Sequence, residues 1–189
     1  HLDSSHRQFK AARLNDWVDA MLENRIETAL ELANTINPNF PLKITRNLNH
    51  AKKWLKENRI NNQRSGVIAS SGALRLKPLG INVKETIDEA LWFLNDENDI
   101  RSSSFLEIAA TEFKVQGLEI DWACICWDGD FRRVKNKWDY NAFKGTAWQK
   151  SKSILDQKYI LNTYRVLLTR ARNGIIVYVP EGTNEDRTR

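Results

Sequence analysis

The sequence predicts an α/β domain in which helices cover both faces of a doubly wound, mostly parallel sheet. Strand-like apolar runs alternate with amphipathic helical segments, which is the order of a β-α-β fold. The short apolar run "GVIAS" at 66–70 is bounded by polar residues, as expected of a strand buried on both faces. At 189 residues and 41% hydrophobic content, the chain can form one sizeable core, so residues 1–180 are predicted to be a single domain.

The first half of the chain contains clearly periodic segments. Residues 11–36 have apolar side chains at helical spacing and predict one bent helix or two, with a possible break at Glu23 and Asn24. The segment 41–45, "PLKIT", alternates as a strand. The segment 49–60 is helical, with its apolar residues on one face.

The alternation continues with a predicted helix at 83–96 and predicted strands at 104–110 and 122–127. Residues 128–146 then become irregular, polar and aromatic. Because this stretch is too long for an ordinary connection in a compact sheet, it is predicted to be a functional or mobile insertion.

The end of the chain is predicted to hold one long helix and one strand. The helix covers 147–172 and stops at Asn173 and Gly174, because these residue types commonly end helices. The strand "IIVYV" follows at 175–179, and residues 181–189 are predicted to form a flexible tail.

Composition restricts the classes of partner. The formal charge of +5 and the pI near 9.2 permit an anionic partner such as nucleic acid or a nucleotide. No apolar run is long enough to cross a membrane, and the amino terminus lacks a signal-peptide pattern, so a cytoplasmic protein without a membrane partner is expected.

The cysteines and histidines do not predict a metal site. Cys124 and Cys126 lie two apart on a predicted strand, which puts them on one face and too close together for ordinary disulfide geometry. Buried thiols in a reducing compartment are expected. The three histidines, His1, His6 and His50, are far away in sequence, so no metal is predicted.

Several catalytic motifs are absent from the 189 residues. The sequence has no phosphate-binding loop, no Gly-x-Gly-x-x-Gly, no serine nucleophile elbow, no His-Glu-x-x-His and no paired-cysteine zinc pattern. The chain is therefore not expected to be a self-contained hydrolase. It also begins without a methionine, so a fragment or a processed product is expected.

Three short polar clusters lie at predicted strand ends. "SSHRQF" contains Arg7 before the first helix, and "TEFKVQGLEID" contains Gly117, whose residue type allows close backbone approach or a positive φ. "NTYRVLLTRAR" places Arg170 and Arg172 between an apolar helical run and the last strand.

Together these motifs resemble the second RecA-like domain of superfamily 1 helicases, and most closely the Schlafen-type DNA/RNA helicase domain family of bacterial proteins. "VQGLEID" is similar to motif V and "NTYRVLLTRAR" to motif VI of that superfamily. "SSHRQF" resembles the motif that opens the second domain, although His6 stands where tyrosine is usual. "GVIASSGALRLKP" resembles a stretch typical of the Schlafen-type branch, so the resemblance covers nearly the whole chain.

The resemblance implies a nucleotide-handling role. Arg170 would be an arginine finger that stabilises charge on the γ-phosphate, and Arg7 would be a second γ-phosphate contact. Glu119 would accept a hydrogen bond from the ribose, with Gly117 and Gln116 shaping the approach. The cofactor, ATP with Mg²⁺, would be held mainly by an N-terminal RecA-like domain that this chain lacks, so this fragment is expected to be inactive alone.

The resemblance also implies a nucleic-acid side, contacted by Thr111 and Lys114. Arg75 follows a predicted strand and is a candidate phosphate contact. Arg132 and Arg133 lie in the predicted insertion, which interleaves basic and aromatic residues, a composition suited to single strands. The alternative is that these aromatics fold back as a lid over the sheet.

Other interpretations stay open for these residues and for the whole chain. Arg170 and Arg172 can instead neutralise the negative end of their helix, and Glu119 can be an ordinary surface carboxylate. The domain can be a non-enzymatic nucleic-acid or protein binding module with vestigial nucleotide residues. A Toprim-like nuclease would need an acidic triad, for which the candidates are Asp96, Asp99, Asp121, Asp128 and Asp130.

Overall fold

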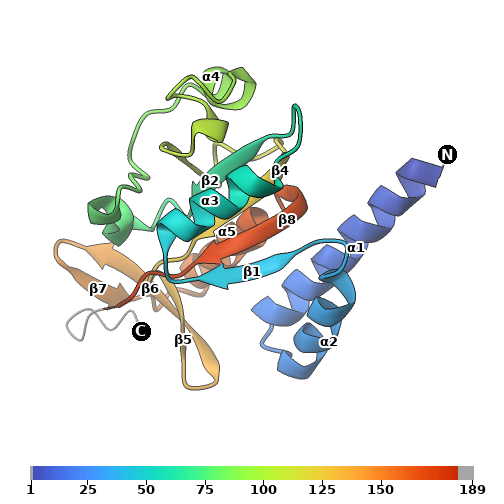
Figure 1. The fold of residues 1–189 in the computed structure, drawn as a ribbon. Helices are drawn as coiled ribbons and strands as arrows, with labels where there is room; N and C mark the ends of the chain where they lie inside the picture. The colour runs from blue at the N-terminus through green and yellow to red at the C-terminus, as the bar shows by residue number, and fades with distance from the viewer. Residues whose placement is uncertain (1, 183–189) are drawn as a thin grey trace.

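The computed structural model describes the backbone of residues 2–182 and the side chains of residues 11–182. Its centre is a five-stranded sheet in the order β1-β8-β4-β2-β3, in which every neighbouring pair is parallel (Figure 1). The strands are β1 (Leu42–Thr45), β2 (Ser65–Ala69), β3 (Ala109–Thr111), β4 (Ile120–Cys126) and β8 (Ala171–Tyr178). The predicted doubly wound α/β architecture is confirmed and is consistent with a RecA-like fold.

Helices cover both faces of this sheet. The helices α1 (Leu2–Leu22) and α5 (Ile154–Leu168) lie on one face, and α3 (Leu48–Asn58) lies on the other (Figure 1). Side chains on β4 alternate between the two layers, because successive residues of a strand point to opposite faces. Ile125 belongs to the core under α1 and α5, whereas the two cysteines pack in the core under α3.

The prediction that both cysteine thiols are buried is confirmed. Cys124 and Cys126 are free and fully buried, and their sulfur atoms lie 3.9 Å apart on the same face of β4. Both thiols therefore serve as small apolar groups of the core.

The helix ends follow local capping signals. α1 and α2 (Ile26–Ile36) are separated at the predicted break, where Asn24 has a φ of +63°. Asn47 caps α3 by accepting a hydrogen bond from His50 N. No helix in the described part of the chain is long and apolar enough to cross a bilayer.

Two predicted elements are shorter in the structure. The helix predicted at 83–96 is α4 (Glu89–Leu94), because the Asp88 side chain accepts from Leu91 N and so fixes the first turn. The strand predicted at 104–110 is only β3, because a 3₁₀ turn, η2 (Ser103–Phe105), is closed by Leu106 in the left-handed conformation. Another 3₁₀ helix, η1 (Leu74–Leu79), follows β2.

The stretch predicted as an irregular insertion forms a second sheet instead. Strands β5 (Phe131–Val134), β6 (Lys137–Lys144) and β7 (Ala147–Lys150) are antiparallel and lie in that order. The helix predicted from 147 was therefore wrong in its first seven residues. Ser153 sets the true start by accepting a hydrogen bond from Asp156 N.

The prediction for Asn173 and Gly174 was also wrong. α5 ends at Leu168, and both residues lie inside β8. Gly174 is required there by close packing. A Cβ at this position would lie 2.7 Å from Trp122 Cζ3 and 3.1 Å from the Pro41 carbonyl oxygen. The tail was predicted at 181–189, and its residues from 183 onward lie outside the described part of the chain.

Gly174→Ala is expected to destabilise the domain by about 1–3 kcal/mol, the usual cost of forcing atoms into a packed core. Urea unfolding measures this change. In a Trp122→Leu background the same substitution should cost much less, because the nearest clashing atom is gone. Equal costs in the two backgrounds would contradict the packing explanation.

Candidate functional site

A polar cleft opens at the amino ends of the central strands. We call it the amino-edge cleft, and its volume is about 640 Å³. Its lining residues come from four separate parts of the chain: Asn62, Arg64, Phe93, Gly117, Leu118, Glu119, Asp121, Arg170 and Arg172. Three of these, Gly117, Glu119 and Arg170, were predicted from the sequence to act together.

Strand pairing brings the two distant motifs together. Glu119 immediately precedes β4, Arg170 immediately precedes β8, and Ile120 N donates to the Arg170 carbonyl oxygen at 3.1 Å. Gly117 has a φ of +83°, which is one of the two roles that its residue type allowed. Open space surrounds its Cα, because an added Cβ would meet no atom within 4 Å.

Arg170 closes the end of α5. Its Nε donates to the Val166 carbonyl oxygen at 3.1 Å, and an Nη2 contact to Thr169 Oγ1 is long at 3.5 Å. Among the described residues, no carboxylate forms an ion pair with Arg170. The Nε–H of Arg170 therefore supplies a hydrogen bond to a carbonyl group at the helix end. The Nη groups have no carboxylate partner in the cleft.

Arg172 pairs with Glu119 across the same cleft. Arg172 Nε lies 2.6 Å from Glu119 Oε2, and the two side chains are 59% and 52% exposed. Arg170 and Arg172 both line this cleft. An ion pair this exposed contributes little stability, so a charged ligand can replace either partner at small cost.

Arg64 forms another wall of the cleft and was not predicted. Its guanidinium donates to the carbonyl oxygens of Leu94 and Asn95 at 2.8 and 2.9 Å and lies 5.4 Å from the Phe93 ring centre. Its backbone N–H donates to Asp121 Oδ2 at 2.7 Å. The sequence around Arg64 gave no motif that singled it out.

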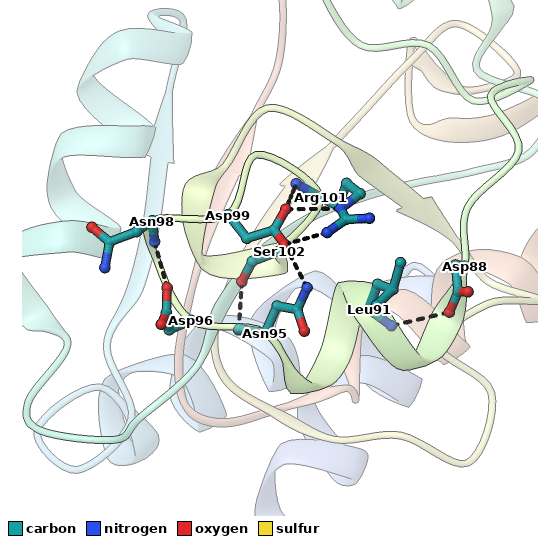
Figure 2. Close-up of polar contacts among 8 residues, drawn as sticks. All are labelled: Asp88, Leu91, Asn95, Asp96, Asn98, Asp99, Arg101 and Ser102. Carbon is teal, nitrogen blue, oxygen red and sulfur yellow. Dashed lines mark hydrogen bonds and ion pairs between the residues drawn. The ribbon is translucent and has the colours of Figure 1, made fainter.

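The loop that receives Arg64 is cross-linked by its own polar side chains (Figure 2). Asn95 Nδ2 donates to Asp99 Oδ2 at 2.6 Å, and Ser102 Oγ donates to the Asn95 carbonyl oxygen at 2.8 Å. Arg101 donates to both Asp99 oxygens and so lowers the pKa of that carboxyl. These contacts hold the carbonyl groups to which Arg64 binds.

A second polar group lies at the opposite, carboxyl ends of the strands. We call it the carboxyl-edge cluster, and its carboxylates are Glu112, Asp128 and Asp130, which are 6%, 4% and 2% exposed. Glu112 accepts from both the N–H and the hydroxyl of Ser71 at 2.8 and 2.7 Å. The cluster therefore fastens the loop after β2 to the ends of β3 and β4.

Burial changes the titration of this cluster. Asp130 accepts hydrogen bonds from Ser70 Oγ at 2.6 Å and Tyr164 Oη at 2.5 Å, yet desolvation still raises its pKa. Desolvation also raises the pKa of Asp128 to about 7, although Gly129 N and Arg75 N donate to it. Among the described residues, no group of three or more acidic, histidine or cysteine side chains is arranged to hold a metal ion.

The residues predicted to contact nucleic acid lie on the carboxyl side or beyond it. Thr111 is buried at the end of β3, and Lys114 in the following loop pairs with Glu89 at 2.6 Å. Arg75 in η1 lies against the Phe143 ring of the small antiparallel sheet, and Arg132 and Arg133 lie in strand β5 of that sheet. These residues are thus separate from the amino-edge cleft.

Gln116 and Arg7, the two other predicted nucleotide contacts, differ in what the structure describes. Gln116 precedes Gly117 in the chain but does not line the cleft. The Arg7 side chain lies outside the described residues, so only its place in α1 is known.

Comparison with protein families matches residues 1–181 to the model described as "Schlafen group 3, DNA/RNA helicase domain". The chain belongs to this family. Searches of curated proteins and of solved structures returned no match. The match spans both the motif around Gly117 and the motif around Arg170, so the amino-edge cleft is a feature of a Schlafen group 3 helicase domain.

Family membership supports a helicase-like function and an interaction with nucleic acid. The Schlafen group 3 helicase domain described here carries its two motif-bearing loops at the amino ends of β4 and β8. Ligands of doubly wound sheets usually gather at the carboxyl ends of the strands. The two motifs instead meet at the opposite edge, because each directly precedes its strand.

The raised pKa of Asp128 predicts a pH-dependent stability. The folded chain binds this proton more tightly than the unfolded chain, so the associated stability is present near pH 4 and is lost as the pH rises to about 7. The loss is at most about 4 kcal/mol. Urea unfolding between pH 4 and 8 should show a smaller decline for Asp128→Asn.

Glu85→Gln provides a control for this measurement, because Glu85 is exposed and far in sequence from the cluster. Its pH profile should follow that of the unmodified chain. If Asp128→Asn has the same decline as the unmodified chain, burial of Asp128 does not control the pH dependence.

Proposed function

We propose that this chain is the second, C-terminal RecA-like domain of a superfamily 1 helicase-like ATPase that moves on DNA or RNA. The supporting observation is that Glu119 and Arg170, from two separate motifs, line one cleft in a member of a helicase domain family. In this proposal the amino-edge cleft faces an N-terminal RecA-like domain of the same parent chain, which holds most of the ATP and its Mg²⁺.

Arg170 is the proposed arginine finger. Phosphoryl transfer develops charge on the γ-phosphate oxygens, and a guanidinium from a neighbouring domain stabilises that charge. The hydrogen bond from Nε to Val166 holds the side chain at the helix end, and the Nη groups remain to meet a phosphate. The geometry suits bidentate contact to an anion.

Glu119 is the proposed ribose contact. Its carboxylate now accepts from Arg172, and it can exchange this exposed partner for a hydroxyl group without leaving a buried charge unpaired. Gly117 leaves open space beside Glu119, as close approach of a nucleotide requires. Gln116 would shape the approach, and Arg7 would add a second γ-phosphate contact.

The proposed cycle couples nucleotide state to domain position. Arg170 touches the γ-phosphate only when the two domains close, and hydrolysis removes that contact. Nucleotide therefore favours the closed state, because a ligand shifts a conformational equilibrium by its preference between states. Thr111, Lys114, Arg75, Arg132 and Arg133 would contact the nucleic acid, which lies away from the cleft and moves with the domain.

A non-enzymatic binding module is the alternative, and one observation favours it. Arg170 and Arg172 already have partners that explain them as a helix-end group and a surface ion pair. In that case the cleft is vestigial, and the domain only holds nucleic acid or a protein.

Nucleic-acid-stimulated ATP hydrolysis by the intact parent protein distinguishes these proposals. Arg170→Ala is expected to reduce the stimulated rate by about 10³-fold or more, because the finger contributes only in the transition state. Arg170→Lys should keep the charge at the helix end but still lose most of the rate, since an ammonium lacks the planar fork.

Arg25→Ala is the matched control, because Arg25 is an exposed arginine in the α1–α2 turn that pairs only locally with Glu23. It should hydrolyse ATP at the parental rate. Normal hydrolysis by folded Arg170→Ala would exclude the arginine finger, and an inert parent protein would favour the binding module.

A further inference from the structure

The positive charge of the chain is concentrated in the small antiparallel sheet. Residues 131–152 carry seven lysines and arginines against one aspartate, so their formal charge of +6 exceeds the +5 of the whole chain. The rest of the chain is therefore close to neutral. A polyanion approaching the domain is attracted mainly to this sheet.

Strand register divides these residues between two faces. Trp138 and Tyr140 pack against the main core. For these two residues, the alternative that the aromatic side chains fold back over the sheet is therefore correct. Because side chains alternate along β6, residues 137, 139 and 143 lie on the other face. Cross-strand pairing adds members from β5 and β7. We call this second face the hairpin face: Arg132, Lys137, Asp139, Phe143, Trp148 and Lys150.

Two aromatic rings lie side by side on the hairpin face. Phe143 and Trp148 are cross-strand partners with ring centres 5.2 Å apart and planes inclined by 69°, and both are half-buried. The Arg75 guanidinium lies 5.4 Å from the centre of the Phe143 ring. The Trp148 indole N–H has no hydrogen-bond partner in the described structure. Because both rings are only half-buried, part of their surface stays accessible to a ligand.

The one acidic residue of the antiparallel sheet, Asp139, partly neutralises its positive charge. Asp139 lies 2.7 Å from Lys150 Nζ and 3.9 Å from Arg132 Nε, and its side chain is 17% exposed. Asp139 therefore holds the Lys150 and Arg132 side chains on either side of its carboxylate. A polyanion that binds there competes with Asp139 for both of them.

Resting on the proposed function, we infer that the hairpin face binds a single strand of nucleic acid, with bases stacking on Phe143 and Trp148. Basic side chains that flank partly accessible rings match the backbone charge and the unpaired bases of a single strand. A duplex conceals its base faces and can use only the cations. Lys137 and Lys150 attract the phosphates, and Asp139 weakens the attraction.

Fluorescence anisotropy of the 189-residue chain with labelled oligonucleotides of about 20 nucleotides tests this inference. The probes are oligo-dT, oligo-rU, a DNA duplex of equal length, and heparin as a polyanion without bases. Both single strands should bind more tightly than the duplex and heparin at one salt concentration. The ratio of the oligo-dT and oligo-rU affinities identifies DNA or RNA as the preferred strand.

Three substitutions separate stacking from charge. Trp148→Leu should weaken single-strand binding about tenfold and leave heparin binding unchanged. Lys150→Ala should lower the slope of log affinity against log salt by about 0.7. Asp139→Asn should strengthen binding, which loss of structure would not do. Lys53→Ala, an exposed lysine on α3, should change nothing.

Two results would overturn the inference. One is equal affinity for heparin and single strands, unaffected by Trp148→Leu and Phe143→Leu in chains with unchanged circular dichroism. The other is no binding of any single strand by the folded chain. Either result leaves Arg170-dependent hydrolysis in the parent protein untouched, so failure of the hairpin face is distinguishable from failure of the proposed ATPase.

Discussion

The central strand β4 is the constraint on which the other parts depend. It pairs in parallel with β2 on one side and β8 on the other, and all its residues are buried except the half-buried Asp121. Glu119 lies directly before β4 and Asp128 lies two residues after it. Seven residues of strand separate these ends by about 20 Å. Strand β4 is rigid and therefore holds the amino-edge cleft and the carboxyl-edge cluster apart at a fixed distance.

The charges of the domain are segregated along this axis. Arginines line the amino-edge cleft, with the exposed Glu119 and the half-buried Asp121 beside them. The carboxylates at the other end are buried among hydroxyl groups and backbone amides. The excess positive charge lies beyond that second end, on the antiparallel sheet. In the proposed arrangement, nucleotide and nucleic acid approach opposite ends of the same strands. Any coupling between them must then involve movement of the whole domain.

Periodicity predicted the parts of the fold that depend on local pattern. The predictions of a buried strand at 66–70, of a helix break at Asn24 and of two buried cysteines on one face agree with the structure. The positive φ at Gly117 and the proximity of Glu119 to Arg170 were predicted through residue type and family resemblance. The strand at 147–150 was missed, because Trp148 is fixed by its partner Phe143 rather than by local propensity. Arg64 was missed for the same kind of reason, since only tertiary contacts place it in the cleft.

The position of β8 has a consequence for synthesis of the chain. β8 is the last strand of the described chain, yet it lies between β1 and β4, and Leu42 pairs with Ile175. The growing polypeptide therefore carries β1 without a neighbour until almost the whole domain has emerged from the ribosome. Contacts between such distant segments form slowly, because a long loop must close first. A ribosome that stalls before Tyr178 would release a sheet divided at its centre, a natural substrate for chaperones.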